Sequence, residues 1–137
     1  MVTPQVLEKI RNEIILSGRD NRYKLEGYGF VLQGLNFYYA KTGEKRHFTG
    51  NELAKGFIEF AHKQFGPLTY DVLKSWGIHT TDDLGYIVYN LIEIKLISKN
   101  EKDALEDFFD VINIKEYLNK KDNYRIDKTH IKSIKGA

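Results

Sequence analysis

The sequence predicts a mainly α fold of the α+β type, with about five helices followed by a small β-hairpin, in an order like that of a winged-helix domain. Two observations lead to this fold class. Five segments between residues 3 and 93 carry apolar residues at helical spacing, most of them behind a helix start signal. Two short apolar runs follow, separated by a polar stretch, which is typical of a hairpin.

The first two helices are expected in the N-terminal third of the chain. Thr3 is a good N-cap and Pro4 suits the first helical position, so the first helix begins there and ends at Ser17-Gly18. The second helix runs over residues 25–40 and carries apolar side chains on two of its sides. A helix of this kind is expected near the centre of a core.

The third and fourth helices have clear boundary signals. Thr49 and Glu52 have the spacing of a capping box, which predicts the start of the third helix. Pro67 suits the first position of the fourth helix. Gly77 then favours a left-handed C-cap, and Ile78 can make the apolar contact that accompanies it.

The last elements are a helix and the hairpin. Thr80 or Thr81 caps the fifth helix, and two aspartates follow in its first turn, where the helix dipole favours negative charge. The hairpin is expected to pair residues 95–98 with residues 109–114 across the polar stretch 99–107. That polar stretch is also compatible with a helical turn.

Length and composition favour one intracellular domain. The chain has 137 residues, of which 42% are hydrophobic, and it has no cysteine, which excludes disulfides and thiolate metal sites. It has no apolar run long enough to cross a bilayer and no signal-peptide core near Met1, so we expect a cytoplasmic protein without a membrane partner.

The basic residues gather near the C-terminus. Residues 115–137 hold seven Lys and Arg against three Asp and Glu, whereas residues 1–114 hold 14 against 16. We therefore expect a globular domain over residues 1–118 and a basic, polar, partly flexible tail over residues 119–137.

Four short motifs stand out in the folded part of the chain. They are an Arg-His-aromatic-Thr-Gly start at 46–50, a Phe-Gly at 65–66, a Trp-Gly-Ile turn at 76–78 and an Asp-Asp-Leu-Gly opening at 82–85. In these motifs, over residues 23–118, the chain resembles an uncharacterised bacterial domain family best known from planctomycetes and verrucomicrobia. That family has no established activity, ligand or catalytic residue, so the resemblance implies none here.

The outward face of the fifth helix favours a protein partner over nucleic acid. With the apolar stripe turned inward, its solvent face carries two carboxylates and no Lys or Arg, which would repel phosphates. Tyrosine is enriched at protein interfaces. We therefore expect a non-enzymatic interaction domain that binds another protein, with self-association left open. Its candidate interaction residues are Tyr86, Tyr89, Asn90 and Glu93.

Two alternatives remain open at this point. The first is a winged-helix-like protein that contacts nucleic acid through its wing and its basic tail. The candidate contacts are Lys99, Lys102, Lys120, Lys121 and Arg125. The second is a site for an anion or small ligand at the start of the third helix, where free amides and basic residues meet. The candidate residues are Lys45, Arg46, His47, Thr49 and Gly50.

An enzyme is the reading that the sequence supports least. The four histidines lack metalloprotease spacing, no serine lies in a nucleophile elbow, and Gly27 and Gly29 do not complete a dinucleotide-binding fingerprint. We therefore expect no catalytic residue, no cofactor and no metal site.

Overall fold

The computed structural model describes residues 2–42, 49–97 and 105–121, and in this part of the chain the ordered elements are helices. The α-helices are α1 (Pro4–Ile10), α2 (Leu25–Thr42), α3 (Gly50–Phe65), α4 (Thr69–Ser75) and α5 (Thr81–Glu93). Residues 114–121 are also helical. Three short turns of helix complete the order, namely η1 (Arg11–Ile15), η2 (Gly66–Leu68) and η3 (Leu105–Phe108).

The predicted start of the first helix is confirmed. Thr3 is the N-cap, its Oγ1 accepts a hydrogen bond from the Val6 amide at 3.2 Å, and Pro4 is the first helical residue. The helix continues from α1 into the π-helical turn η1. Gly18 then adopts a φ of 78°, so the helix ends where the Ser17-Gly18 pair predicted.

The start of α3 is also as predicted. The Glu52 carboxylate accepts from the Thr49 amide at 3.2 Å, and the Glu52 amide donates to the Thr49 hydroxyl at 3.1 Å. These two reciprocal bonds make a complete capping box.

The turn between α4 and α5 follows its sequence signals as well. Gly77 has a φ of 92°, and the Ile78 amide donates to the Leu73 carbonyl at 2.9 Å, which is the long bond of a Schellman motif. On the α5 side, the Asp83 carboxylate accepts from the Thr80 amide at 3.1 Å. The chain therefore reverses sharply over residues 76–80.

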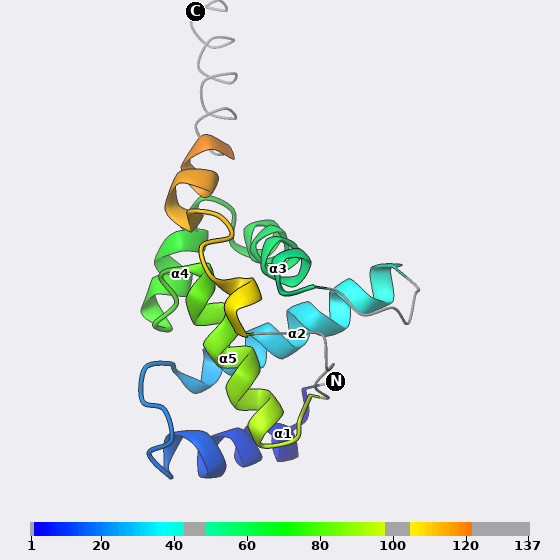
Figure 1. Cartoon of the computed structure of the whole chain (residues 1–137), viewed down its shortest axis with the longest axis vertical. Helices are drawn as coiled ribbons and strands as arrows, with labels where there is room; N and C mark the ends of the chain where they lie inside the picture. Colours follow the sequence, from blue (N-terminus) through cyan, green and yellow to red (C-terminus); the bar gives the residue numbers. More distant parts are fainter. Residues whose placement is uncertain (1, 43–48, 98–104, 122–137) are drawn as a thin grey trace, which may run out of the picture.

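Helix α5 is the centre of the molecule (Figure 1). It packs against η3, α2 and α3, and most of its residues are buried. The buried positions are Thr81, Leu84, Gly85, Ile87, Val88, Asn90 and Leu91. One continuous core surrounds these residues, to which α1, α2, α3, α4 and the helix at 114–121 also contribute. A helix enclosed in this way has little surface left for a ligand.

The predicted β-hairpin is wrong, because the described residues contain no strand. At the first predicted strand, Lys95 adopts a φ of 64° and the Leu96 amide donates back to the Leu91 carbonyl at 3.0 Å. These residues therefore finish α5 as a C-cap. Residues 98–104, which hold Ser98 and most of the polar stretch, lie outside the described part.

The second predicted strand forms turns and a helix start instead. The Asn113 side chain accepts from the Glu116 amide at 3.0 Å, so Asn113 caps the helix at 114–121. Before it, Phe108 in η3 is 5% exposed and lies against Gly85 of α5 and Gly50 of α3, which have no side chain to hold it away. The segment after α5 is therefore fixed by burial of Phe108 between α3 and α5 and not by the pairing of two strands.

The helix at 114–121 runs across the expected domain boundary at residue 118. Leu118 is buried in the core, and the tail beyond residue 121 lies outside the described residues. No helix within residues 2–42, 49–97 and 105–121 combines the length and the apolar character that a bilayer crossing requires.

Candidate functional site

Two of the four predicted interaction residues lie at the surface together. Tyr89 is 43% exposed, and Glu93 one turn later is also exposed. A hydrogen bond to Glu93 raises the pKa of Tyr89. The Glu93 carboxylate also lies 4.0 Å from the Arg19 guanidinium, on the loop after η1. We call Arg19, Tyr89 and Glu93 the Tyr89 cluster.

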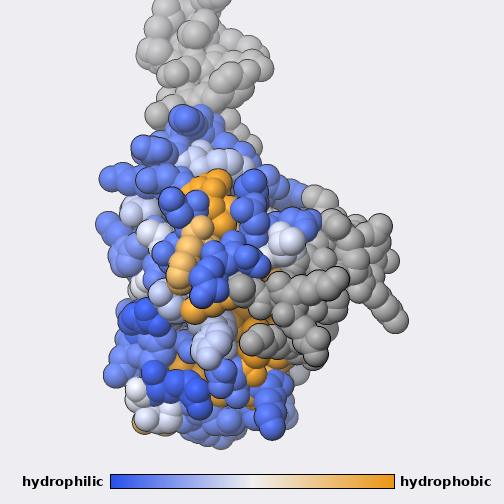
Figure 2. All heavy atoms as spheres, viewed as in Figure 1, coloured by the Kyte–Doolittle hydropathy of each residue, from blue (hydrophilic) through white to orange (hydrophobic). Residues whose placement is uncertain are grey.

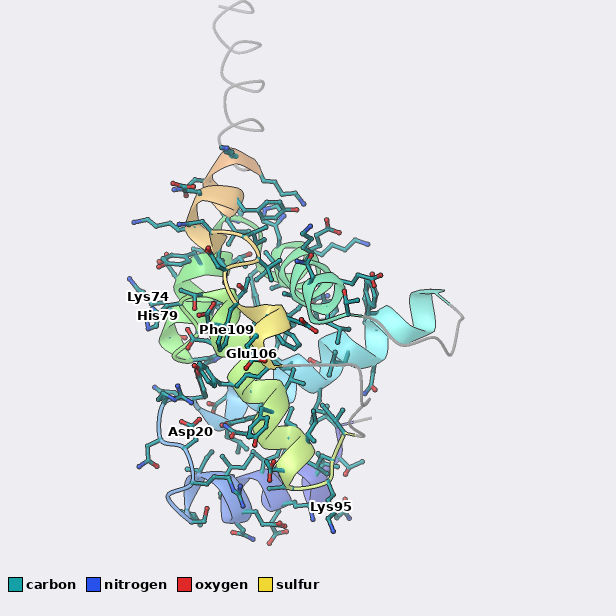
Figure 3. The ribbon with its side chains drawn as sticks, viewed as in Figure 1. Asp20, Lys74, His79, Lys95, Glu106 and Phe109 are labelled. Carbon is teal, nitrogen blue, oxygen red and sulfur yellow. The ribbon has the colours of Figure 1, made fainter. Side chains whose placement is uncertain are left out.

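Tyr86, the third predicted interaction residue, is only partly exposed for contact with a partner. Its ring centre is 5.7 Å from that of Phe109, and the Arg22 guanidinium lies 4.3 Å from the ring centre. Figure 3 places Phe109 on the segment that crosses in front of α5. Part of the Tyr86 ring is therefore covered by contacts within the protein.

The prediction that Asn90 faces solvent is wrong. Asn90 is 7% exposed, and its side-chain amide donates to the Asp20 carboxylate at 2.8 Å and to the Tyr28 hydroxyl at 3.0 Å. The reason is that α5 is buried on more sides than its apolar stripe indicates. A polar side chain can occupy such a position when its hydrogen bonds are satisfied inside.

Asp20 is the centre of a polar network that the sequence did not reveal. The residue is 8% exposed, and its carboxylate accepts from Arg22 Nε at 3.0 Å and from Arg22 Nη2 at 2.8 Å. Burial by itself would raise the pKa of Asp20, but the bonds from Arg22 and Asn90 outweigh it and lower this pKa to about 2. Burial raises the pKa of Tyr28 to about 12. Asp20 is thus held ionised and Tyr28 neutral.

A second bond ties the same loop to the other end of α5. The Tyr23 hydroxyl donates to the Asp83 carboxylate at 2.6 Å, and burial together with this bond raises the pKa of Tyr23. Asp83 also accepts from the His79 amide at 2.8 Å. Among the described residues, no buried side-chain nitrogen or oxygen lacks a hydrogen-bond partner, so we assign the network to stability.

The start of α3 already holds a carboxylate. Lys45, Arg46 and His47 of the expected anion site lie outside the described residues, whereas Thr49 and Gly50 lie inside. Thr49 is engaged with Glu52 in the capping box, and Gly50 is buried beneath Asp107 and Phe108.

Because the Glu52 carboxylate occupies the helix start, the described residues do not favour an added anion there.

The expected nucleic-acid contacts are only partly described. Lys99, Lys102 and Arg125 lie outside the described residues. Lys120 is exposed on the helix at 114–121, and the ammonium of Lys121 lies 5.2 Å from the centre of the Tyr117 ring. The structure therefore brings two of the five basic residues together on one helix end.

A hollow of about 250 Å³ lies where the end of α2, the middle of α3 and the helix end at Lys121 meet. Aromatic rings and both signs of charge line it, from residues that include Phe37, Tyr38, Glu59, Phe60, Lys63 and Lys121. The sequence pattern does not predict this hollow, because its residues come from three separate segments. The available signal was the second apolar side of residues 25–40, which carries Phe37.

No metal centre is evident in the described part of the chain, where no three His, Asp or Glu side chains gather closely enough to hold an ion. The face shown in Figure 2 is mostly hydrophilic, and apolar atoms emerge on it in a narrow strip between polar residues. In this view the described residues therefore show small apolar areas and no broad apolar patch.

Comparison with known proteins adds no assignment: no family model, no curated protein and no solved structure matches the chain. The resemblance to the planctomycete and verrucomicrobial domain family stays a prediction.

Proposed function

We propose that the protein is an interaction domain that binds another protein without catalysis, and that the Tyr89 cluster is its contact surface. The observation that carries the proposal is the exposure of Tyr89. Tyr89 is 43% exposed on a helix that is mostly buried, and its hydrogen-bond partner Glu93 lies 4.0 Å from the Arg19 guanidinium. A tyrosine side chain has few torsion angles, so it loses little conformational entropy when it binds.

The burial of α5 supports a protein partner over duplex DNA. A recognition helix must place one whole face in the major groove, but α5 is enclosed by η3, α2 and α3. Of its outward residues, Glu93 carries a negative charge that phosphates would repel. Tyrosine and arginine, in contrast, are the residue types that dominate protein–protein hot spots.

The test is affinity capture from the native cell with the full-length chain as bait. Wild type, Tyr89→Ala and Leu68→Ala are compared, each with and without nuclease treatment. Leu68 is 63% exposed and lies on η2, away from the Tyr89 cluster, so it is a matched control for loss of an exposed apolar side chain. Tyr89→Ala removes an exposed ring, so its melting temperature should stay near that of wild type.

We expect capture of a partner protein that persists after nuclease treatment and is unchanged with Leu68→Ala as bait. The amount captured should fall at least tenfold with Tyr89→Ala. Capture that nuclease abolishes, or that all three baits share equally, would overturn it.

A further inference from the structure

The hollow beside α3 has an aromatic wall that is open to solvent. Phe37 is 38% exposed, and its ring centre lies 4.9 Å from that of the buried Phe60. Phe60 in turn packs on Phe30, so the wall continues into the core. An exposed ring on a rigid base is a favourable place for an apolar side chain of another molecule.

Two lysines, Lys63 and Lys121, line the hollow, and neither forms an ion pair with another described side chain. The Lys63 ammonium lies 5.7 Å from the Phe37 ring centre, and Lys121 lies 5.2 Å from that of Tyr117. The carboxylate of the same hollow, Glu59, accepts from the Tyr117 hydroxyl at 3.3 Å. The two lysines therefore favour an occupant that brings its own negative charge.

The size of the hollow selects the kind of occupant. At about 250 Å³ it is smaller than the ~300–1,000 Å³ pockets that enclose whole small molecules, so it fits one side chain of a longer chain. A nucleic-acid strand needs a row of cations along its backbone, whereas this hollow has two lysines and a carboxylate.

We infer that the hollow binds an acidic peptide segment of a partner protein. One aromatic or large apolar side chain of the segment packs on Phe37, and neighbouring carboxylates pair with Lys63 and Lys121. This site is separate from the Tyr89 cluster and does not depend on it. It adds a sequence preference, acidic and aromatic together, to the proposed interaction domain.

The probe is a phage-displayed library of random dodecapeptides, selected on the immobilised full-length chain. Selected peptides are synthesised with a fluorescent label, and their affinities are measured by anisotropy. Lys63→Glu reverses the charge at the hollow. Lys74→Glu is the matched control, because Lys74 also lies over an aromatic ring, 5.9 Å from the centre of Tyr70, and projects from the edge of the molecule (Figure 3).

We expect the selected peptides to be enriched in Asp or Glu next to Phe, Tyr, Trp or Leu. Lys63→Glu and Phe37→Ser should each weaken their binding at least tenfold, whereas Lys74→Glu should leave it within twofold. Binding should also weaken as salt is raised, because the lysines are near the surface.

Three results would overturn the inference: no acidic enrichment, equal weakening by Lys63→Glu and Lys74→Glu, or tight binding of a labelled 15-nucleotide oligo(dT) that Lys63→Glu abolishes. The last result would make the hollow a nucleic-acid site. None of these results bears on capture through Tyr89, so failure here and failure of the proposed function remain distinguishable.

Discussion

Asp20 is a buried carboxylate that the fold holds ionised by three kinds of donor. It accepts from the side chain and the backbone amide of Arg22, and from the side-chain amide of Asn90 on α5. Hydrogen bonds to charged groups are about twice as strong as those between neutral groups. A single residue therefore fixes the loop after η1 to the central helix α5.

We predict that Asp20→Asn destabilises the protein by about 2 kcal/mol at pH 7, because an amide cannot accept from both Arg22 and Asn90 as the carboxylate does. The measurement is urea denaturation followed by circular dichroism. Asp71→Asn is the control, since Asp71 is exposed on α4, and it should change stability by less than about 0.5 kcal/mol. Equal effects of the two substitutions would contradict the role given to Asp20.

The same carboxylate makes part of the stability depend on pH. The pKa of Asp20 is about 2 in the folded protein, below its ordinary value of 3.8. Because the folded pKa is the lower one, the stabilisation is present in full above about pH 5 and is lost as the pH falls toward about 2. The difference between wild type and Asp20→Asn should therefore shrink over that range.

At the scale of elements, burial of Phe108 holds the segment after α5 against the helices, where a β-hairpin was expected. It packs against Gly85 of α5 and Gly50 of α3, and next to it the Thr81 hydroxyl accepts from the Val111 amide at 3.1 Å. The Asp82 carboxylate also accepts from the Asp110 amide at 2.9 Å. The segment after α5 is thus held against the start of that helix by one ring and two hydrogen bonds.

We predict that Phe108→Ala lowers the free energy of unfolding by about 3–4 kcal/mol, because loss of the buried ring would leave a cavity between α3 and α5. Phe109→Ala is the matched control. That ring is half-buried against Tyr86, so its loss should cost less than half as much. Urea midpoints of the two variants decide this, and a larger effect at residue 109 would contradict the packing described.

The parts of the fold that the sequence predicts are those determined by residues close together in the chain. The caps at Thr3, Thr49 and Gly77 were predictable because each involves residues three to five positions apart. The hairpin was wrong because an apolar run suits a strand and a buried turn equally well. The N-cap at Asn113 is the local feature that decides for a helix at this place.

At the scale of the whole molecule, α5 is enclosed by η3, α2 and α3. A DNA-reading helix must instead expose one whole face to the major groove. We predict that the full-length chain does not discriminate between duplex DNA sequences, and that any affinity falls linearly on a log–log plot against salt. Fluorescence anisotropy with several unrelated duplexes measures this. Sequence-selective binding that Tyr89→Ala abolishes would contradict it.

Only the part of the candidate site that lies on a single helix, α5, was predictable from the sequence. Tyr89 and Glu93 were placed outward by helical spacing alone. Asn90 was misplaced because its partner, Asp20, is 70 residues away and no local pattern records that pairing. The hollow combines α2, α3 and the helix at 114–121, so only the folded chain reveals it.

The bonds between the loop at residues 20–23 and α5 bear on how fast the protein folds. They join residues 60 to 70 positions apart, between Tyr23 and Asp83 and between Asp20 and Asn90. Helical proteins usually fold fast because most of their contacts are local, and closing long loops adds an entropic barrier. This chain should fold more slowly than a helical bundle of the same length, with α5 settling only after the N-terminal loop has reached it.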